Sequence, residues 1–305
     1  MHLVGILLKV SNVISIRDLK YSGGISLDMI EIAQQCFGKD FVEKEMLHKT
    51  WCNSPPNSRV FAAYENNELL AFNFFLAHRA IIGGVSRLVF QSCHSGTGAS
   101  ARGRGLFSNI TNHAKVELAP DGDYIIGFPN HKSQPIFVNK LGFKVIPLTR
   151  IYAPCTPASL SNLMFNVDAY KRARADQSLV RIDQYALADW KQAEHPDGII
   201  RFEFEKNLIW GRCCERIVLG RTLTLFDAGG CDLSKPFLLK ETLERLRHMY
   251  GVDAVRFVCT NDSLLGQAWR WKLDGDNTEP LIWFPLKEGE GIPKFDVHSG
   301  LKDVY

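Results

Sequence analysis

The sequence has no long hydrophobic run, no low-complexity tract, no internal repeat and no C-x-x-C pair. Its apolar start, Leu3 to Leu8, ends at Lys9 and is too short to cross a bilayer, so we expect neither a membrane span nor a signal peptide. The eight cysteines lack the spacing of a zinc site. We therefore expect no metal and reduced thiols, as in a cytoplasmic protein.

The sequence also lacks a large excess of charge of one sign, because the formal net charge is only +3. Nucleic-acid-binding domains usually carry a dense basic face, so we expect no nucleic-acid partner. The composition, 46% hydrophobic and 23% charged, is that of a globular protein, and 305 residues favour two domains. Nothing in the sequence predicts the oligomeric state.

The order of sequence patterns predicts an α+β fold. A strand over Ser11–Leu19 precedes a helix that begins at Ser26 and ends at Gly38, and a second helix is expected over Phe41–Trp51. An antiparallel meander then covers Arg59–Tyr64, Leu69–Ala80 and Arg87–His94. The next elements are a helix, a strand, a helix and a strand over Leu106–Leu118, Tyr124–Phe128, Pro135–Leu141 and Phe143–Leu148.

A boundary is expected at Ala153–Ser161, where Pro154 and Pro157 interrupt regular structure. It would separate a domain over residues 1–152 from a second α+β domain over residues 162–305. The second half predicts the helix Leu238–Tyr250 and four strands, which are Ile199–Phe204, Thr222–Phe226, Ala254–Cys259 and Leu281–Pro285.

The segment Arg102–Ser108 reads R-G-R-G-L-F-S and opens a predicted helix. Glycines let the backbone approach a ligand closely, and the amide groups at a helix start favour an anion. It is not a Walker loop, because no Gly-Lys-Ser/Thr follows. It is not a dinucleotide fingerprint either, because Ser108 replaces the third glycine. A plain strand-to-helix connection is the alternative.

With its surroundings, this segment resembles the coenzyme motif of the GNAT acetyltransferase superfamily. Arg102 and Gly105 match two fixed positions, whereas Phe107 stands where a small residue is usual. The strand Tyr124–Asn130 and the short helix within Ser133–Phe143, which ends in Gly-Phe, match the family's next elements. The resemblance covers residues 11 to 150.

The resemblance implies a mixed, V-splayed sheet flanked by helices, a second, smaller GNAT-like domain, and acetyl-CoA as co-substrate. The diphosphate would lie on the amides of Gly103, Arg104, Gly105, Leu106, Phe107 and Ser108, beside Arg102. The pantetheine arm would follow the strand edge at Gln91, Ser92 and Cys93, with Asn130 and Phe137 on its far side. The reaction implied is acetyl transfer to a primary amine by direct attack.

Direct attack requires a group that takes the proton of the amine and a donor for the thioester oxygen. His94, at the end of the strand that points at the thioester, is the candidate catalytic residue, although a strand-end histidine can also be structural. Many relatives have a tyrosine acid in the last motif helix, and Val138 stands at that position.

The second half is expected to bind the acceptor, with Trp210 and Arg212 as candidate residues, although a core Trp210 and a surface Arg212 are the alternative. By resemblance to two-domain proteins of bacterial surface-sugar pathways, the acceptor would be a nucleotide-linked amino sugar. The other functions considered are a non-catalytic acyl-CoA-sensing module and a peptidoglycan-bridge-type aminoacyl transferase. Relatives of the latter type lack a strong pyrophosphate loop.

Overall fold

The computed structural model describes residues 13–19, 26–38, 54–218, 220–269, 273–274, 280–288 and 292–301. The expected helix Phe41–Trp51 and the apolar stretch Leu3–Leu8 lie outside these ranges. Within them, no helix combines the length and the apolar character needed to span a membrane.

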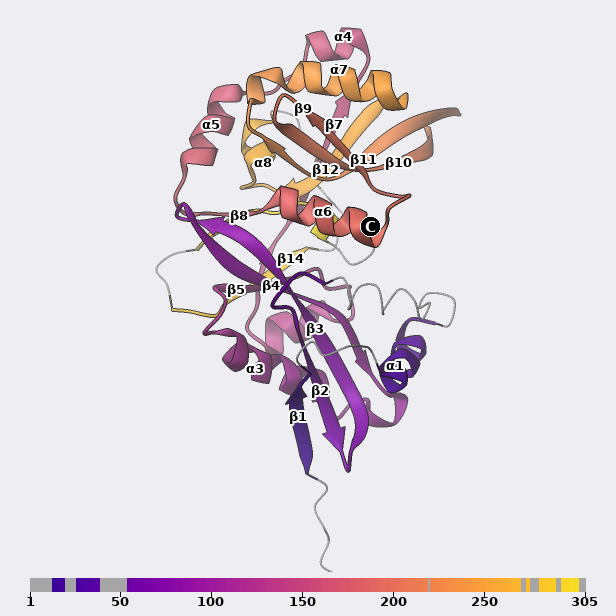
Figure 1. The fold of residues 1–305 in the computed structure, drawn as a ribbon, viewed down its shortest axis with the longest axis vertical. Coiled ribbons are helices and arrows are strands. Elements are labelled where there is room, and N and C mark those ends of the chain that lie inside the picture. The colour runs from indigo at the N-terminus through magenta and orange to yellow at the C-terminus, as the bar shows by residue number, and fades with distance from the viewer. Residues whose placement is uncertain are drawn as a thin grey trace, which may run out of the picture.

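A large mixed sheet occupies one end of the molecule, with the strand order β1-β2-β3-β4-β5-β14-β6 (Figure 1). The predicted meander is confirmed, since β3 pairs antiparallel with both β2 and β4. β4 and β5 pair in parallel through the crossover helix α3. The bounds are β1 Ile14–Asp18, β2 Arg59–Glu65, β3 Glu68–Ile82, β4 Val85–Thr97, α3 Leu106–Leu118 and β5 Tyr124–Gly127.

Helices α1 and α3 cover opposite faces of this sheet. α1 (Leu27–Phe37) begins at Ser26, whose side chain accepts from the Met29 N–H, and ends at Gly38, as the sequence predicts. Its buried residues pack with Phe74 and Leu76 of β3. The buried stripe of α3 packs with the alternate residues of the strands, such as Phe75. Side chains two apart in a strand share a face, which explains this division.

The structure divides the predicted strand Phe143–Leu148 into β6 (Lys144–Ile146) and β7 (Leu148–Pro154), which belong to different sheets. Pro147 lies between them and has no N–H to continue a ladder. The predicted helix Pro135–Leu141, which precedes β6, is a single π-helical turn, η2 (Ile136–Lys140).

The second sheet has the order β13-β7-β12-β11-β10-β9. Its meander, crossover helix and parallel strand repeat the connectivity of β2 to β5, because β11 and β12 pair in parallel across α7. The bounds are β9 Ile200–Phe204, β10 Asn207–Val218, β11 Arg221–Leu233, α7 Leu239–Tyr250, β12 Ala254–Thr260 and β13 Leu273–Asp274.

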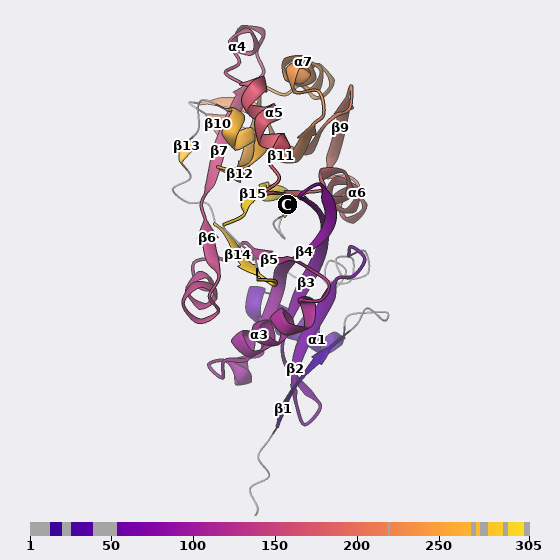
Figure 2. The same cartoon turned by 90° about the vertical axis from the view of Figure 1, so that its left-hand side faces the viewer.

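The two sheets exchange strands. β14 (Leu281–Pro285), from near the C-terminus, lies between β5 and β6 of the first sheet. β7, which directly follows β6, pairs with β12 of the second sheet. Figure 2 shows β6 and β7 as one continuous path from the first sheet to the second.

Helix α6 (Gln184–Glu194) lies between the two sheets (Figure 1). Its residues Leu187 and Trp190 share one apolar cluster with Phe74 of β3 and Leu208 of β10. The remaining elements are η1 Ala99–Ala101, α4 Pro157–Ser161, α5 Val167–Ala175, β8 Leu179–Ile182, η3 Pro236–Leu238, α8 Leu264–Ala268, β15 Lys294–Asp296 and η4 Ser299–Leu301. The predicted class, α+β with a mixed sheet flanked by helices, is confirmed.

Candidate functional site

Strands β4 and β5 separate beside the glycine-rich loop. Their parallel pairing ends at Ser92 and Gly127. β4 continues to Thr97, whereas β5 ends at Gly127. From His94 to Thr97, none of the described strands pairs with β4 on this side. An extended ligand can therefore add to this edge as a strand would.

A bulge in β4 lies at His94. The register between β3 and β4 shifts between Phe72 and Phe74, and His94 has a φ of 43°. A positive φ is uncommon outside glycine and is found at β-bulges. The imidazole is half-buried and lies edge-on to the ring of Phe74, with 6.0 Å between the ring centroids. The bulge thus lies at the point where β4 has left β5, and its histidine packs on Phe74 of β3.

The loop from Arg102 to Gly105 connects β4 to α3. Gly103 and Gly105 have φ values of 79° and 73°, a left-handed conformation that side chains disfavour. A Cβ added at either position would have no neighbour within 4 Å among the described residues, so the space beside both glycines is open. The first α3 amide with a helical bond is that of Asn109, which donates to the Gly105 carbonyl at 3.1 Å.

The amides of Gly103, Arg104, Gly105, Leu106, Phe107 and Ser108 therefore have no acceptor in the described part of the chain. Helix starts always leave such donors, and the helix dipole adds partial positive charge there. Backbone donors in such an arrangement can bind an anion, and their spacing suits a diphosphate.

The two arginines of the loop differ in their partners. Arg104 forms an ion pair with Glu65 of β2, with 2.6 Å between the closest atoms. This hydrogen bond raises the pKa of Arg104 and lowers the pKa of the Glu65 carboxyl. Arg102 is exposed and donates to the Gln35 carbonyl of α1 at 3.2 Å. The two guanidinium groups are thus bonded to α1 and β2, and Glu65 balances the charge of Arg104.

The segment after β5 contains the other two predicted coenzyme-binding residues, Asn130 and Phe137. The Asn130 side chain accepts from the amides of Lys132 and Ser133 at 3.0 Å and so closes the turn into η2. Phe137 is buried and packs edge-on against Phe107, the second residue of α3, with ring centroids 5.2 Å apart. Phe137 is thus a support for the start of α3.

The three predicted strand-edge residues occupy different environments. Gln91 is buried, and its amide donates to the Leu301 carbonyl at 2.6 Å. The Ser92 hydroxyl accepts from the side-chain amide of Asn73 at 3.0 Å, on the opposite face. Cys93 is buried in the cluster beneath α1. Because Gln91 and Ser92 pair with β5, the unpaired edge begins further along β4 than the sequence predicts.

Sequence reasoning missed His78 of β3. Its Nε2 lies 2.9 Å from the amide oxygen of Gln91, and its ring tilts against Trp190 of α6. Burial lowers the pKa of His78 to about 4, so the ring is neutral at pH 7. A histidine within the apolar run Leu69–Ala80 was the available signal, because a polar group in a buried strand requires a partner.

Trp210 and Arg212 do not lie together at an open surface. Trp210 is 0% exposed, and its indole N–H donates to the Gln184 side chain at 3.1 Å. Gly229 and Gly300 lie against its ring, where a Cβ would approach within 2.3 Å of it. Arg212 is exposed on β10. Trp210 is therefore a core residue, which is the alternative that the sequence left open.

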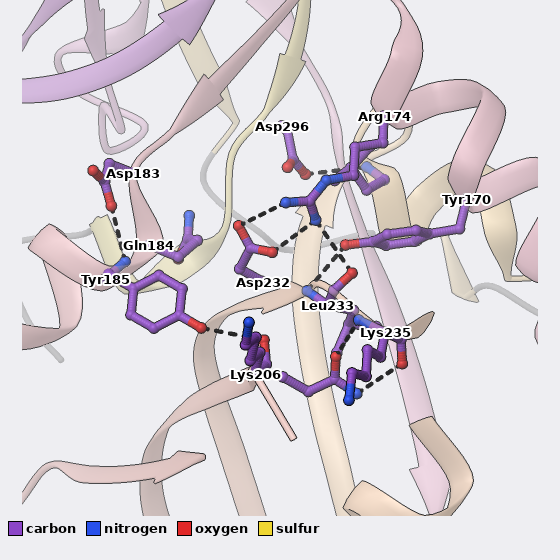
Figure 3. A network of polar contacts seen from close by, with 12 residues as sticks. Tyr170, Arg174, Asp183, Gln184, Tyr185, Lys206, Asp232, Leu233, Lys235 and Asp296 are labelled. Carbon is purple, nitrogen blue, oxygen red and sulfur yellow. Dashed lines mark hydrogen bonds and ion pairs between the residues drawn. The ribbon is translucent and has the colours of Figure 1, made fainter. Parts of the chain in front are cut away.

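Figure 3 shows a polar network within the second half of the chain. Arg174 of α5 donates to Asp232 at 2.7 Å, and the hydroxyl of Tyr170 accepts from the Leu233 amide at 3.1 Å. A cavity of about 210 Å³ borders this network. The buried Asp296 at its wall accepts from the Leu264 amide at 3.0 Å. Each of these contacts joins two elements of the second half, α5 to β11 and α8 to β15.

The described residues hold no cluster of His, Cys, Asp or Glu suited to a metal ion. Burial raises the pKa of the Cys155 thiol to about 11 and raises that of the Cys231 thiol well above its usual value. These thiols stay protonated at neutral pH, which suits core cysteines and not nucleophiles.

No family model matches the chain, and no curated protein matches it in sequence. Solved structures do match its fold. A probable N-acyltransferase from Enterococcus faecalis V583 has a TM-score of 0.56 and 11% identity, over 90% of this chain and 73% of that one. A GCN5-related N-acetyltransferase from Anabaena variabilis has a TM-score of 0.55 and 12% identity, over 90% and 73%.

A GCN5-related N-acetyltransferase from Kribbella flavida has a TM-score of 0.51 and 12% identity, over 88% of this chain and 71% of that one. The similarity extends over most of the chain and includes the second half. At these identities it demonstrates the fold, and the predicted GNAT architecture is confirmed at that level.

Proposed function

We propose that the protein is an acyl-CoA-dependent N-acetyltransferase. The observation that carries the proposal is the Gly103–Gly105 loop, which opens α3 next to the point where β4 and β5 separate. The second half repeats the strand connectivity, but Leu238 stands at the start of α7 where Gly105 stands at the start of α3. We therefore propose a single coenzyme site, in the first half of the chain.

In this proposal the backbone amides of Gly103 to Ser108 hold the diphosphate of acetyl-CoA, with Arg102 and Arg104 beside it. The pantetheine amides pair with the edge of β4 from Cys93 toward Thr97, and Gln91 and Ser92 lie at the inner end of that edge. Asn130 is proposed to lie near the pantetheine arm, as the resemblance implies. The shape of the separated strands supports this assignment, because only an extended chain fits beside a strand edge.

Acetyl-CoA supplies the activated acyl group, and the chain supplies positioning and proton transfer. Backbone N–H groups at the bulge of β4 would donate to the thioester oxygen as charge develops on it. His94 would accept the proton of the attacking amine or return one to the leaving thiolate. Direct attack needs no enzyme nucleophile when both reactants are held in near-attack geometry.

The first test is calorimetric titration of the full chain with acetyl-CoA, with NADH and ATP as controls. We expect selective binding of acetyl-CoA with one site per chain. A folded protein that does not bind acetyl-CoA would mean that the loop is a plain connection between β4 and α3.

For the acceptor, we keep the sequence-based proposal of a nucleotide-linked amino sugar, which rests on resemblance alone. The second half, 162–305, would contribute to its binding, with exposed Arg212 as the remaining candidate residue. A panel of amines assayed by thiol release tests this. Turnover with other amines but not with amino-sugar nucleotides would exclude the proposed acceptor.

A second candidate is acyl-CoA binding without turnover, which Val138 favours because relatives have a tyrosine acid at that position. Acetyl-CoA binding in calorimetry, with no thiol release from any amine in the panel, would favour this sensing function over catalysis.

A further inference from the structure

The edge of strand β3 has a gap. β2 pairs with β3 as far as Phe75, and β8 pairs with the same edge from Ala80 onward. Between them, Leu76–Arg79 has no strand neighbour on this edge among the residues that the structure describes. Unpaired strand edges are usually covered or charged, because they attract other strands.

Two contacts fix the direction of the backbone groups in this gap. The Ala77 N–H donates to the Ser58 hydroxyl at 3.0 Å, and the Arg79 carbonyl accepts from the Asp183 N–H at 2.8 Å. The N–H and C=O of one strand residue point to the same side. The Ala77 carbonyl and the Arg79 N–H therefore both face the gap, and they flank His78.

A cavity of about 520 Å³ lies against this edge, within the usual range of ligand pockets. The loop from Ser54 to Asn57, β3 and α6 border it. Buried Ile182, Leu187 and Trp190 form an apolar wall, and Arg79 and Asp183 form an ion pair beside it, 2.5 Å apart.

His78 also lines the cavity and carries no charge. Its Nε2 faces the side-chain oxygen of Gln91, which can only accept, so Nε2 carries the proton. The neutral ring is consistent with its deep burial against Trp190. The cavity is thus lined by apolar side chains, the uncharged polar side chains of Ser54 and Asn57, one neutral imidazole and one ion pair, which suits a ligand without net charge.

We propose that this cavity binds one residue of a short peptide or N-acyl amino acid, in extended conformation, as an added piece of strand. The ligand N–H donates to the Ala77 carbonyl, and the ligand C=O accepts from the Arg79 N–H. This is the bonding pattern of a parallel strand pair, in which one residue bridges the two neighbours of its partner. The ligand side chain then lies on the face of His78, toward Leu187 and Trp190.

This site is separate from the diphosphate loop, and the proposal goes beyond acetyl transfer. His78 is bonded to Gln91 of β4, so the peptide residue would lie one strand away from the strand proposed for the pantetheine arm. Peptide binding and acetyl-CoA binding are measured separately, and either can fail without the other.

The test uses the full chain and N-acetyl-L-phenylalanine methylamide as probe, followed by ligand-observed NMR titration. We expect a dissociation constant on the order of 1 mM for a ligand of this size. The matched ligand, methylated on the phenylalanine nitrogen, lacks the N–H and should bind at least about fivefold more weakly. Equal binding of the two ligands, or no binding at about 20 mM, would overturn the proposal.

Two variants at one position separate the backbone from the side chain. Arg79→Ala and Arg79→Pro both remove the ion pair with Asp183, but only proline removes the N–H. This N–H lies outside the ladder with β4, and proline is tolerated at such edge positions. We expect Arg79→Ala to bind the probe within about twofold of the native chain and Arg79→Pro to lose at least about tenfold.

A further pair of variants applies if circular dichroism shows that Arg79→Pro does not fold. Ala193 is exposed and lines the cavity, so Ala193→Trp should obstruct it and abolish probe binding. Gln192→Trp adds the same ring to α6 outside the cavity lining and should bind normally. Native affinity in either Arg79→Pro or Ala193→Trp would contradict the assigned site.

Discussion

At the scale of single residues, backbone conformation decides which positions of the glycine loop can change. Gly105 begins α3 with a positive φ and open space around its α-carbon. A side chain there costs on the order of 1 kcal/mol of backbone strain and projects into the open space beside the amides to which the diphosphate is proposed to bind. Strain and ligand exclusion can therefore be separated by a second glycine with the same φ.

Gly105→Glu should abolish acetyl-CoA binding, because it places a carboxylate among the amide donors of the loop. Gly220→Glu is the matched control, since Gly220 has a φ of 75° and open surroundings in the turn between β10 and β11. Calorimetry with acetyl-CoA and thermal unfolding of both variants distinguish the effects. Native coenzyme affinity in Gly105→Glu would rule out the diphosphate site.

His94→Ala should lower kcat by roughly 10²–10⁴-fold, the usual contribution of a general acid or base. The affinity for acetyl-CoA should stay within about twofold, because the coenzyme is proposed to be held by backbone groups. Steady-state kinetics and calorimetry on the same preparation measure both quantities. A variant with unchanged kcat would remove His94 from the mechanism.

His78 should make the protein less stable in acid. Burial is the main cause of its folded-state pKa of about 4, whereas an unfolded histidine titrates near 6.5. Between these values only the unfolded chain binds the proton, so stability is complete above about pH 6.5 and falls as the pH decreases toward 4. The loss is on the order of 3 kcal/mol.

Urea unfolding of the native chain and of His78→Gln at pH 7 and pH 4 measures this contribution. The glutamine variant should be less stable at pH 7, and the difference between the two proteins should shrink at pH 4. A difference that does not depend on pH would show that His78 titrates normally.

At the scale of elements, β14 gives the first sheet a strand that lies far away in sequence. Trp283 of β14 is buried, with its ring centroid 5.9 Å from that of Tyr124 in β5 and 5.7 Å from that of Phe295 in β15. The ammonium of Lys144 in β6 lies 4.8 Å from the ring centroid. One side chain thus links several strands.

Trp283→Ala should destabilise the protein by about 3–5 kcal/mol, the usual cost of removing a buried tryptophan. Val145→Ala on the neighbouring strand β6 is the control, and it should cost less because Val145 is 41% exposed. Urea denaturation followed by circular dichroism gives both free energies. A cost below about 1 kcal/mol for Trp283→Ala would show that β14 is not integral to the sheet.

At the scale of the whole molecule, the exchange of strands ties the two halves together. A chain that ends at residue 152 retains the proposed coenzyme loop but lacks β14, so β5 and β6 lose the strand that joins them. It also exposes apolar surface that α6 covers in the full chain. The division into a coenzyme-binding domain 1–152 and a second domain 162–305 remains a prediction, whereas folding should require both halves.

The fragment 1–152 should therefore be insoluble or lack a cooperative unfolding transition, and it should not bind acetyl-CoA. The full chain, expressed in parallel, is the reference for solubility, thermal unfolding and calorimetry. A soluble fragment with native coenzyme affinity would show that the first half is an independent domain.

The sequence alone determined the local elements and the one loop with special chemistry. The cap at Ser26, the stop at Gly38 and the bounds of α3 follow from short-range interactions, which depend on neighbouring residues only. The apolar run Leu281–Pro285 predicted a strand for the same reason. The α+β class followed from the order of such elements.

Only the tertiary structure decided which sheet each strand joins and which polar side chains meet. Leu281–Pro285 joins the first sheet because it pairs with β5 on one side and with β6 on the other. No local pattern encodes partners so distant in sequence. The contact of His78 with Gln91, the gap in β3 and the burial of Trp210 have the same origin. Hydrogen bonds and packing between remote segments depend on the closed fold, whereas helix caps and strand periods do not.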